Sequence, residues 1–224
     1  MAPGAATALR TLHFLDEKIW FPPLEEADEE GLLAAGGDLS AERLIYAYRH
    51  GIFPWYEGQV PLWWSPDPRF VLFPSELCIS KSMKQVLKKQ LFHVTRDQAF
   101  SQVIKRCAAV PRPGQNGTWI TEAVVKGYHD LHKLGHAHSY EAWQGSCLVG
   151  GFYGVRLGQV FFGESMFSDA SNASKAAFIT AVEGMKADGL RLIDCQVHTT
   201  HLESLGARFL SRQYFVDLLR QWAV

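Results

Sequence analysis

The sequence predicts an α+β protein made of two parts, and three observations lead to this prediction. Its 224 residues are enough for one large domain or two small ones. Residues 19–74 hold four of the seven tryptophans and most of the prolines. The rest of the chain alternates between apolar spacings typical of helices and of strands. We therefore expect a small N-terminal α/β domain over residues 1–70, with a flexible leader, and a larger domain over residues 71–224.

The composition excludes several broad classes of protein. Hydrophobic residues make up 47% of the chain and charged residues 20%, which excludes a disordered chain. Lys and Arg total 22 against 23 for Asp and Glu, so the net charge of -1 creates no overall field that would attract a polyanion. No apolar run approaches the roughly 20 residues that a membrane helix requires.

The N-terminal residues and the cysteines bear on the compartment. The segment MAPGAATALRTLHFL lacks the apolar core of a secretory signal, so we interpret it as a frayed tail and expect a cytoplasmic protein without membrane association. The four cysteines never form Cys-x-x-Cys, which favours free thiols over a zinc ribbon. Nothing in the pattern indicates an obligate dimer, and we expect a monomer.

Secondary structure is expected from caps, glycines and apolar spacing. In the N-terminal part, Asp38 or Ser40 should cap a short helix that Gly51 ends. The WWSPDPR segment (63–69) is predicted as an extended connector rather than a central strand, because proline lacks the N–H of a ladder bond. Further along, helices are expected near 80–90, 97–108, 121–134 and 173–187, a strand meander over 137–167 with turns at Gln144–Gly145 and Leu157–Gly158, and a strand over 190–197.

Two strands carry acidic residues in unusual places. In the strand over 190–197, the period of two puts Asp194 and Gln196 on one face. Pattern alone favours a half-exposed edge strand with these side chains toward water. Glu164 lies in an aromatic and Met-rich run, where a buried carboxylate is costly unless it is paired. A cationic ligand is one candidate partner.

Basic and imidazole side chains form two further groups. Lys81, Lys84 and Lys88 fall on one helical stripe with Lys89 beside it, which indicates either a solvated face or a phosphate-binding surface. Four histidines, His129, His132, His136 and His138, straddle the end of a predicted helix. Since no cysteine completes a tetrahedral set, we predict no metal site there.

Several short segments together resemble the leucyl/phenylalanyl-tRNA–protein transferase family of bacterial aminoacyltransferases. They are GLLAAGGDLS (31–40), GIFPWY (51–56), WWSPDPR (63–69), TWIT (118–121), GHAHSYEAW (135–143), LVGGFYGV (148–155), FFGESMFS (161–168), NASKAA (172–177), IDCQV (193–197) and SLGA (204–207). The resemblance runs from about residue 19 to about residue 215, in matching order. It implies a small N-terminal domain packed on a C-terminal GNAT-like acyltransferase domain.

The resemblance also implies an activity. The family transfers Leu or Phe, and less well Met, from aminoacyl-tRNA to the α-amino group of proteins with N-terminal Arg or Lys, which marks them for degradation. It implies no metal or other cofactor, because the aminoacyl ester is already activated and needs only orientation, a proton acceptor and charge stabilisation.

Site residues follow from the same resemblance. The catalytic group would be Asp194, Gln196 and Glu164, with Glu164 on a substrate amine. Asp194 would orient Gln196, whose carbonyl either accepts a proton from the amine or only positions it while the ribose oxygen takes the proton. The pocket for the amino-acid side chain would comprise Trp55, Phe152, Phe161 and Met166, with Tyr48, Trp119 and Tyr128 near the terminal adenosine. The tRNA acceptor stem would contact Lys81, Lys84, Lys88 and Lys89 through its phosphates.

Two other functions compete with this one. An acetyl-CoA-dependent N-acetyltransferase would share the fold, but the segment Ser168–Asn172 before the corresponding helix is acidic and disfavours a pyrophosphate. A non-catalytic tRNA-binding module would use the lysines and exposed aromatics and leave Asp194 and Gln196 dispensable.

Overall fold

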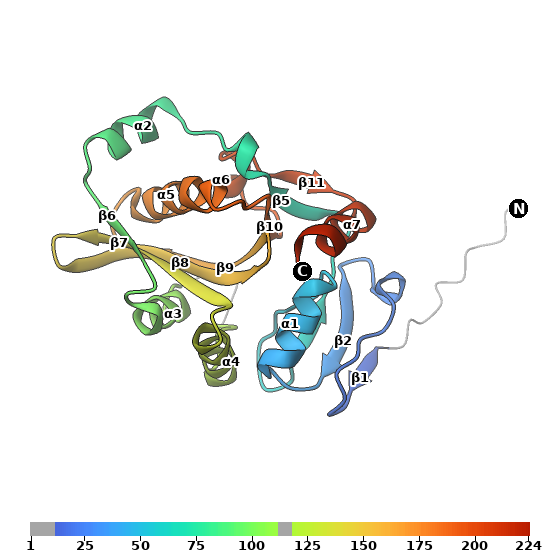
Figure 1. Cartoon of the computed structure of the whole chain (residues 1–224). Coiled ribbons are helices and arrows are strands. Elements are labelled where there is room, and N and C mark those ends of the chain that lie inside the picture. Colours follow the sequence, from blue (N-terminus) through green and yellow to red (C-terminus); the bar gives the residue numbers. More distant parts are fainter. Residues whose placement is uncertain (1–11, 112–117) are drawn as a thin grey trace, which may run out of the picture.

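The computed structural model of the chain describes residues 12–111 and 118–224 and places them around two sheets (Figure 1). The smaller sheet has the strand order β1 (His13–Leu15), β2 (Leu32–Gly36), β4 (Leu62–Trp64) and β3 (Phe53–Pro54). The larger sheet has the order β11 (Arg208–Leu210), β5 (Arg69–Leu72), β10 (Leu192–Gln196), β9 (Val160–Ser168), β8 (Cys147–Leu157), β7 (Ala137–Gln144) and β6 (His93–Arg96). The chain passes from one sheet to the other between Trp64 and Arg69.

The described residues also form helices with recognisable starts. These are α1 (Ala41–Arg49), α2 (Lys81–Lys88), α3 (Phe100–Ala108), α4 (Glu122–Lys133), α5 (Ala173–Ala187), α6 (Thr200–Glu203) and α7 (Arg212–Trp222), with short 3₁₀ turns at Leu24–Glu26 and Pro74–Glu76. The hydroxyl oxygens of Ser40, Ser80 and Thr121 accept the backbone N–H of the third residue beyond, which satisfies a donor that the first helical turn leaves unpaired. None of these helices is long and apolar enough to cross a membrane.

Both faces of the larger sheet are covered by helices. α5 packs on β7 and β8 on one face, and α3 and α4 lie on the other (Figure 1). Alternate residues of one strand therefore enter different cores: Phe161 is buried on the α5 side, and Phe162 lies in the cluster shared with α3 and α4. Burial on both faces explains why β8 and β9 are apolar almost throughout.

The N-terminal part packs against the larger sheet through α1. This helix contacts α4, and the Tyr48 ring lies 4.9 Å from the Phe162 ring of β9. At its end Gly51 has a φ of 77°, and a Cβ there would stand 3.3 Å from the Phe215 ring of α7. Glycine thus permits both the left-handed turn and the close approach of α7.

Most helices and strands predicted for the larger part are confirmed. Helices α2 to α5, the meander β7–β8–β9 and strand β10 lie where the sequence places them, within a few residues. Ser40 is the cap of α1, and the side chain of Asp38 accepts the Ser40 N–H instead.

Three expectations are wrong. Trp63 and Trp64 belong to β4, which lies between β2 and β3, because the prolines follow this strand and leave its N–H groups intact. Residues His13–Leu15 of the expected tail form β1, paired in parallel with β2, while residues 1–11 are outside the described range. Finally, β10 is an inner strand between β5 and β9, not an edge strand.

Candidate active site

The site forms where β9 and β10 stop pairing. The two strands run parallel, and their last paired residues are Phe162 and Asp194. Glu164 and Gln196 each stand two residues beyond that pair, and the Gln196 Nε2 donates to the Glu164 Oε1 at 2.9 Å. Two side chains 32 residues apart in the sequence thus meet at the end of the ladder.

Irregularities in both strands aim these side chains. The β8–β9 register shifts so that Tyr153 faces Ser165 and Gly154 faces Gly163, which leaves Glu164 as the extra residue of a bulge. A Cβ on Gly154 would stand 2.2 Å from the Phe162 carbonyl oxygen, so only glycine allows this approach. On β10 the register shifts between Asp194 and Gln196. Bulges of this kind redirect side chains at functional sites.

Gln196 adopts a backbone conformation that is rare for a residue with a side chain. Its φ is 64°, in the left-handed region, which costs a non-glycine residue about 1–2 kcal/mol. The backbone N–H of Gln196 donates to the Asp194 Oδ1 at 2.9 Å, which stabilises the turn. Asp194 therefore contacts the backbone of Gln196 rather than its side-chain amide.

Asp194 is held in a buried ion pair with Arg69 of β5. Arg69 Nε donates to Oδ1 at 2.8 Å and Nη2 donates to Oδ2 at 2.7 Å, and both side chains are at most 1% exposed. The guanidinium lies 4.6 Å from the Phe53 ring and 4.8 Å from the Phe215 ring. Both carboxylate oxygens are thus bound by protein groups.

Glu164 is surrounded by donors. The hydroxyl of Tyr48 donates to Oε1 and that of Tyr128 to Oε2, each at 2.7 Å, and the two hydroxyls also contact each other. Burial raises the pKa of Glu164 from its usual 4.5 to about 7, although the donated hydrogen bonds oppose the shift. Burial and the Glu164 charge raise the pKa of both tyrosines well above 10, so both remain protonated donors.

A cavity of about 400 Å³ opens beside this cluster. Its lining is mostly apolar, and the predicted site residues that border it are Trp55, Trp119, Phe152, Glu164, Met166, Asp194 and Gln196. Tyr48, Tyr128 and Phe161 are fully buried and lie outside this lining. Phe161 supports the wall, since its ring meets the Phe152 ring edge-on at 6.0 Å.

Sequence reasoning missed several residues of the site. Phe53 and Phe178 also line the cavity, and so does His201, whose Nε2 is buried without a hydrogen-bond partner among the described residues. Arg69 was treated as part of a connector. The signal that could have found it is a charged residue opening a short apolar run, Arg69–Leu72, which is buried throughout.

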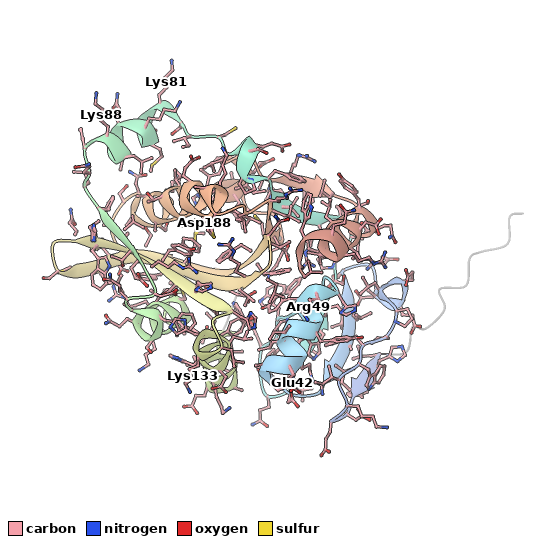
Figure 2. The ribbon with its side chains drawn as sticks, in the orientation of Figure 1. Glu42, Arg49, Lys81, Lys88, Lys133 and Asp188 are labelled. Carbon is pink, nitrogen blue, oxygen red and sulfur yellow. The ribbon has the colours of Figure 1, made fainter. Side chains whose placement is uncertain are left out.

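The four lysines of α2 and the four histidines singled out in the sequence lie apart from the cavity lining. Lys81, Lys84, Lys88 and Lys89 are exposed, and Lys81 and Lys88 point outward from α2 at the edge of the molecule (Figure 2). Met83 anchors the helix from its buried side. His138 contacts Asp97 at 2.8 Å, and His132 stacks on Phe100. In residues 12–111 and 118–224 no three His, Cys, Asp or Glu side chains are grouped to hold a metal.

Comparison with known proteins identifies relatives over nearly the whole chain. A leucyl/phenylalanyl-tRNA–protein transferase from Flavobacterium johnsoniae is 53% identical over 210 residues, which cover 93% of this chain and 99% of the relative. Proteins of the same name from Pseudomonas fluorescens and Syntrophobacter fumaroxidans are 60% identical over 202 residues and 56% identical over 208 residues, covering 89% and 92% of this chain and 89% of each relative.

Among solved structures, a conserved protein of unknown function from Staphylococcus epidermidis aligns over 80% of this chain and 68% of its own length. The sequence identity is 10% and the TM-score is 0.45, and this match assigns no fold family. Family models give the decisive match. The model of leucyl/phenylalanyl-tRNA–protein transferase matches residues 71–220, and that of its N-terminal domain matches residues 37–67. The chain belongs to the leucyl/phenylalanyl-tRNA–protein transferase family of aminoacyltransferases.

Proposed function

We propose that this protein transfers leucine or phenylalanine, and less well methionine, from aminoacyl-tRNA to the α-amino group of proteins that begin with arginine or lysine. The new N-terminal residue marks the acceptor for degradation. The observation that carries the proposal is the Glu164 carboxylate in the wall of an apolar cavity of about 400 Å³. A carboxylate suits a substrate amine, and the apolar lining suits a leucine or phenylalanine side chain.

The reaction needs few protein groups. The neutral amine nitrogen of the acceptor attacks the ester carbonyl carbon, a C–N bond forms, and the C–O bond to the ribose breaks. The amine loses one proton, and the departing ribose oxygen takes it up. Because the amide nitrogen of Gln196 is bound to Glu164, the amide oxygen is left to accept an N–H of the attacking amine. Gln196 then positions the nucleophile, which is the main requirement for an activated ester.

The aromatic residues divide into two groups in this proposal. Phe152 and Met166 form the wall for the aminoacyl side chain, with Phe161 behind Phe152. Trp55, which is 39% exposed, borders the same cavity and would complete this wall, whereas Trp119 would contact the terminal adenosine. Tyr48 and Tyr128, expected beside the adenosine, are buried, so we assign them to holding Glu164.

The tRNA body would bind along α2. Lys81, Lys84, Lys88 and Lys89 are exposed and concentrate positive charge in a chain whose net charge is -1. Such contacts to phosphates carry no sequence information. Recognition of the amino acid would then fall to the cavity.

The remaining expectations are part of the same proposal. The change of sheet between Trp64 and Arg69, and the two family models meeting between residues 67 and 71, support a division into domains near residue 70. We retain the GNAT-like fold of the larger domain, the monomeric state and the cytoplasmic location as proposals. None of them is needed for the chemistry at Glu164.

The direct test is transfer of radiolabelled leucine from Leu-tRNA to a protein with N-terminal Arg. The same protein beginning with Ala is the acceptor control, and Asp194→Ala is the enzyme control. Label on the Arg protein alone, lost with Asp194→Ala, is the expected result. Equal labelling of both acceptors would contradict the acceptor rule, and no labelling at all would contradict the reaction.

A further inference from the structure

Asp194 borders the cavity, but both of its carboxylate oxygens are already bound by protein groups. It is fully buried, and its oxygens accept three hydrogen bonds, two from Arg69 and one from the Gln196 backbone. Whatever Asp194 contributes to transfer must pass through one of these two neighbours. Gln196 is the neighbour that reaches the cavity.

The Gln196 turn depends on the position of the Asp194 carboxylate. A left-handed glutamine is unfavourable by itself, and the N–H bond to Oδ1 is the described contact that compensates for it. If Oδ1 moves, the turn loses its acceptor. The side chain amide of Gln196 would then no longer meet Glu164, since the two stand beyond the last paired residues of their strands.

Arg69 fixes that carboxylate in a way that no other cation would. A planar guanidinium binds both carboxylate oxygens at once, whereas a lysine ammonium is a point donor. The rings of Phe53 and Phe215 lie on the guanidinium and restrict its movement. The ion pair is expected to contribute little to the free energy of unfolding, because buried ion pairs are costly to desolvate. In addition, Arg69 Nη1 is buried without a hydrogen-bond partner among the described residues.

We propose that Arg69 is a positioning residue for aminoacyl transfer: it fixes Asp194, Asp194 fixes the turn at Gln196, and the turn places the Gln196 amide on Glu164. The proposal rests on the proposed function for its effect on rate. Its structural part, the coupling of Arg69 to Glu164, holds without any substrate.

The kinetic test is Arg69→Lys, alone and combined with Gln196→Ala. Since a displacement of about 1 Å in an active site can cost about 100-fold in rate, we expect kcat to fall roughly tenfold to 100-fold with little change in KM for aminoacyl-tRNA. In the Gln196→Ala background, Arg69→Lys should cause no further loss of kcat, because Arg69 acts on the substrate only through the Gln196 side chain and that side chain is already absent. Losses that multiply in the double variant would overturn the proposal.

A second readout uses the free protein. The Gln196 amide lowers the pKa of Glu164, so Arg69→Lys and Gln196→Ala should both raise the midpoint of the Glu164 carboxyl titration, followed by ¹³C NMR. A midpoint unchanged by Arg69→Lys would overturn the proposal even if the rate falls. Should the wild-type protein fail to transfer leucine, the proposed function is wrong. The titration still decides whether Arg69 is coupled to Glu164 through Asp194 and Gln196.

Arg43 supplies a matched control. It is also a fully buried arginine, and it donates to the backbone carbonyls of Asp16 and Lys18 in the N-terminal part. Arg43→Lys should lower the unfolding temperature and leave both kcat and the Glu164 titration unchanged. If Arg69→Lys does not fold, Asp194→Asn tests the same link, because the amide matches the carboxylate in shape but turns an N–H toward Arg69. For this variant the kinetic readout decides, because removing the negative charge of Asp194 by itself lowers the pKa of Glu164. A loss of kcat that is absent in the Gln196→Ala background supports the proposal, and a loss that multiplies with Gln196→Ala overturns it.

Discussion

Replacing Glu164 by glutamine should make folding less sensitive to pH. The carboxyl has a usual pKa of 4.5 in the unfolded chain and about 7 in the folded protein, because burial penalises its charge. The folded state therefore binds this proton more tightly. Its stabilising effect is fully present below pH 4.5 and is lost as the pH rises through 7.

The magnitude follows from the size of the shift. Each unit of pKa corresponds to about 1.4 kcal/mol, so a rise from 4.5 to about 7 amounts to about 3 kcal/mol of stability lost by the wild type between these pH values. Glutamine cannot ionise and resembles the protonated acid. Its oxygen can accept from Gln196 and Tyr48, its amide can donate to Tyr128, and Tyr128 can donate to Tyr48, so every contact of the cluster is kept.

The assay is urea unfolding of both proteins at several pH values from 4.5 to 8. The free energy of unfolding of Glu164→Gln minus that of the wild type should rise with pH and level off above about pH 7. Glu183→Gln, at an exposed position on α5, is the control and should follow the wild type at every pH. A difference between Glu164→Gln and wild type that stays flat over this range would refute the reasoning, since Glu164 would then have its ordinary acidity.

Three further predictions concern activity. If Glu164 binds a substrate amine as a carboxylate, kcat/KM of the wild type should fall as the pH drops below about 7. The slow variant Glu164→Gln should show no such fall. A wild-type profile that is flat through pH 7 would argue against this role. Phe152→Met should change the ratio of Leu to Phe transfer, because fit in an apolar pocket alters discrimination by about 1–3 kcal/mol; identical ratios in single-turnover assays would remove Phe152 from the specificity wall. Replacing Lys81, Lys84, Lys88 and Lys89 by alanine should raise KM for aminoacyl-tRNA. It should also reduce the slope of log affinity against log salt by roughly 3, as expected for the loss of about four phosphate contacts. Unchanged transfer at moderate salt would show that α2 does not bind the tRNA.

The sequence was a good guide wherever local chemistry decides the structure. Ser40, one of the two residues expected to cap the first helix, does so, and Thr121 is likewise a short polar residue that caps an apolar helical run at the expected position. Gly145 and Gly158 adopt positive φ in the two turns of the meander. These features depend on a few neighbouring residues, so a pattern of a few residues is enough to predict them.

Prediction failed where partners are distant along the chain. The proline rule is correct for Pro66 and Pro68, but it was applied to Trp63 and Trp64, whose N–H groups are intact and pair with other strands. The position of β10 inside the sheet depends on its pairing with β5. Because β5 begins with the charged residue Arg69, the sequence pattern assigns that residue to a connector rather than to a strand. An inner strand bearing a buried aspartate requires a buried cation, and only the fold shows that Arg69 supplies it.

The alternation rule shows most clearly why the site itself could not be derived from spacing. It put Asp194 and Gln196 side by side on one face and left Glu164 on another strand, which implies that the first two act as a pair. In the structure the bulge at Glu164 and the left-handed turn at Gln196 break that alternation, and the side chains that meet are Gln196 and Glu164. Both irregularities are unfavourable for a regular strand. Gly154 of the neighbouring strand gives the first its space, and Asp194, which is held by the distant Arg69, gives the second its acceptor. A strained geometry supported by several distant residues is what preorganised sites require. Strand periodicity therefore fails to predict the side-chain directions at the irregular positions of β9 and β10, and these are the positions of the proposed site residues Glu164 and Gln196.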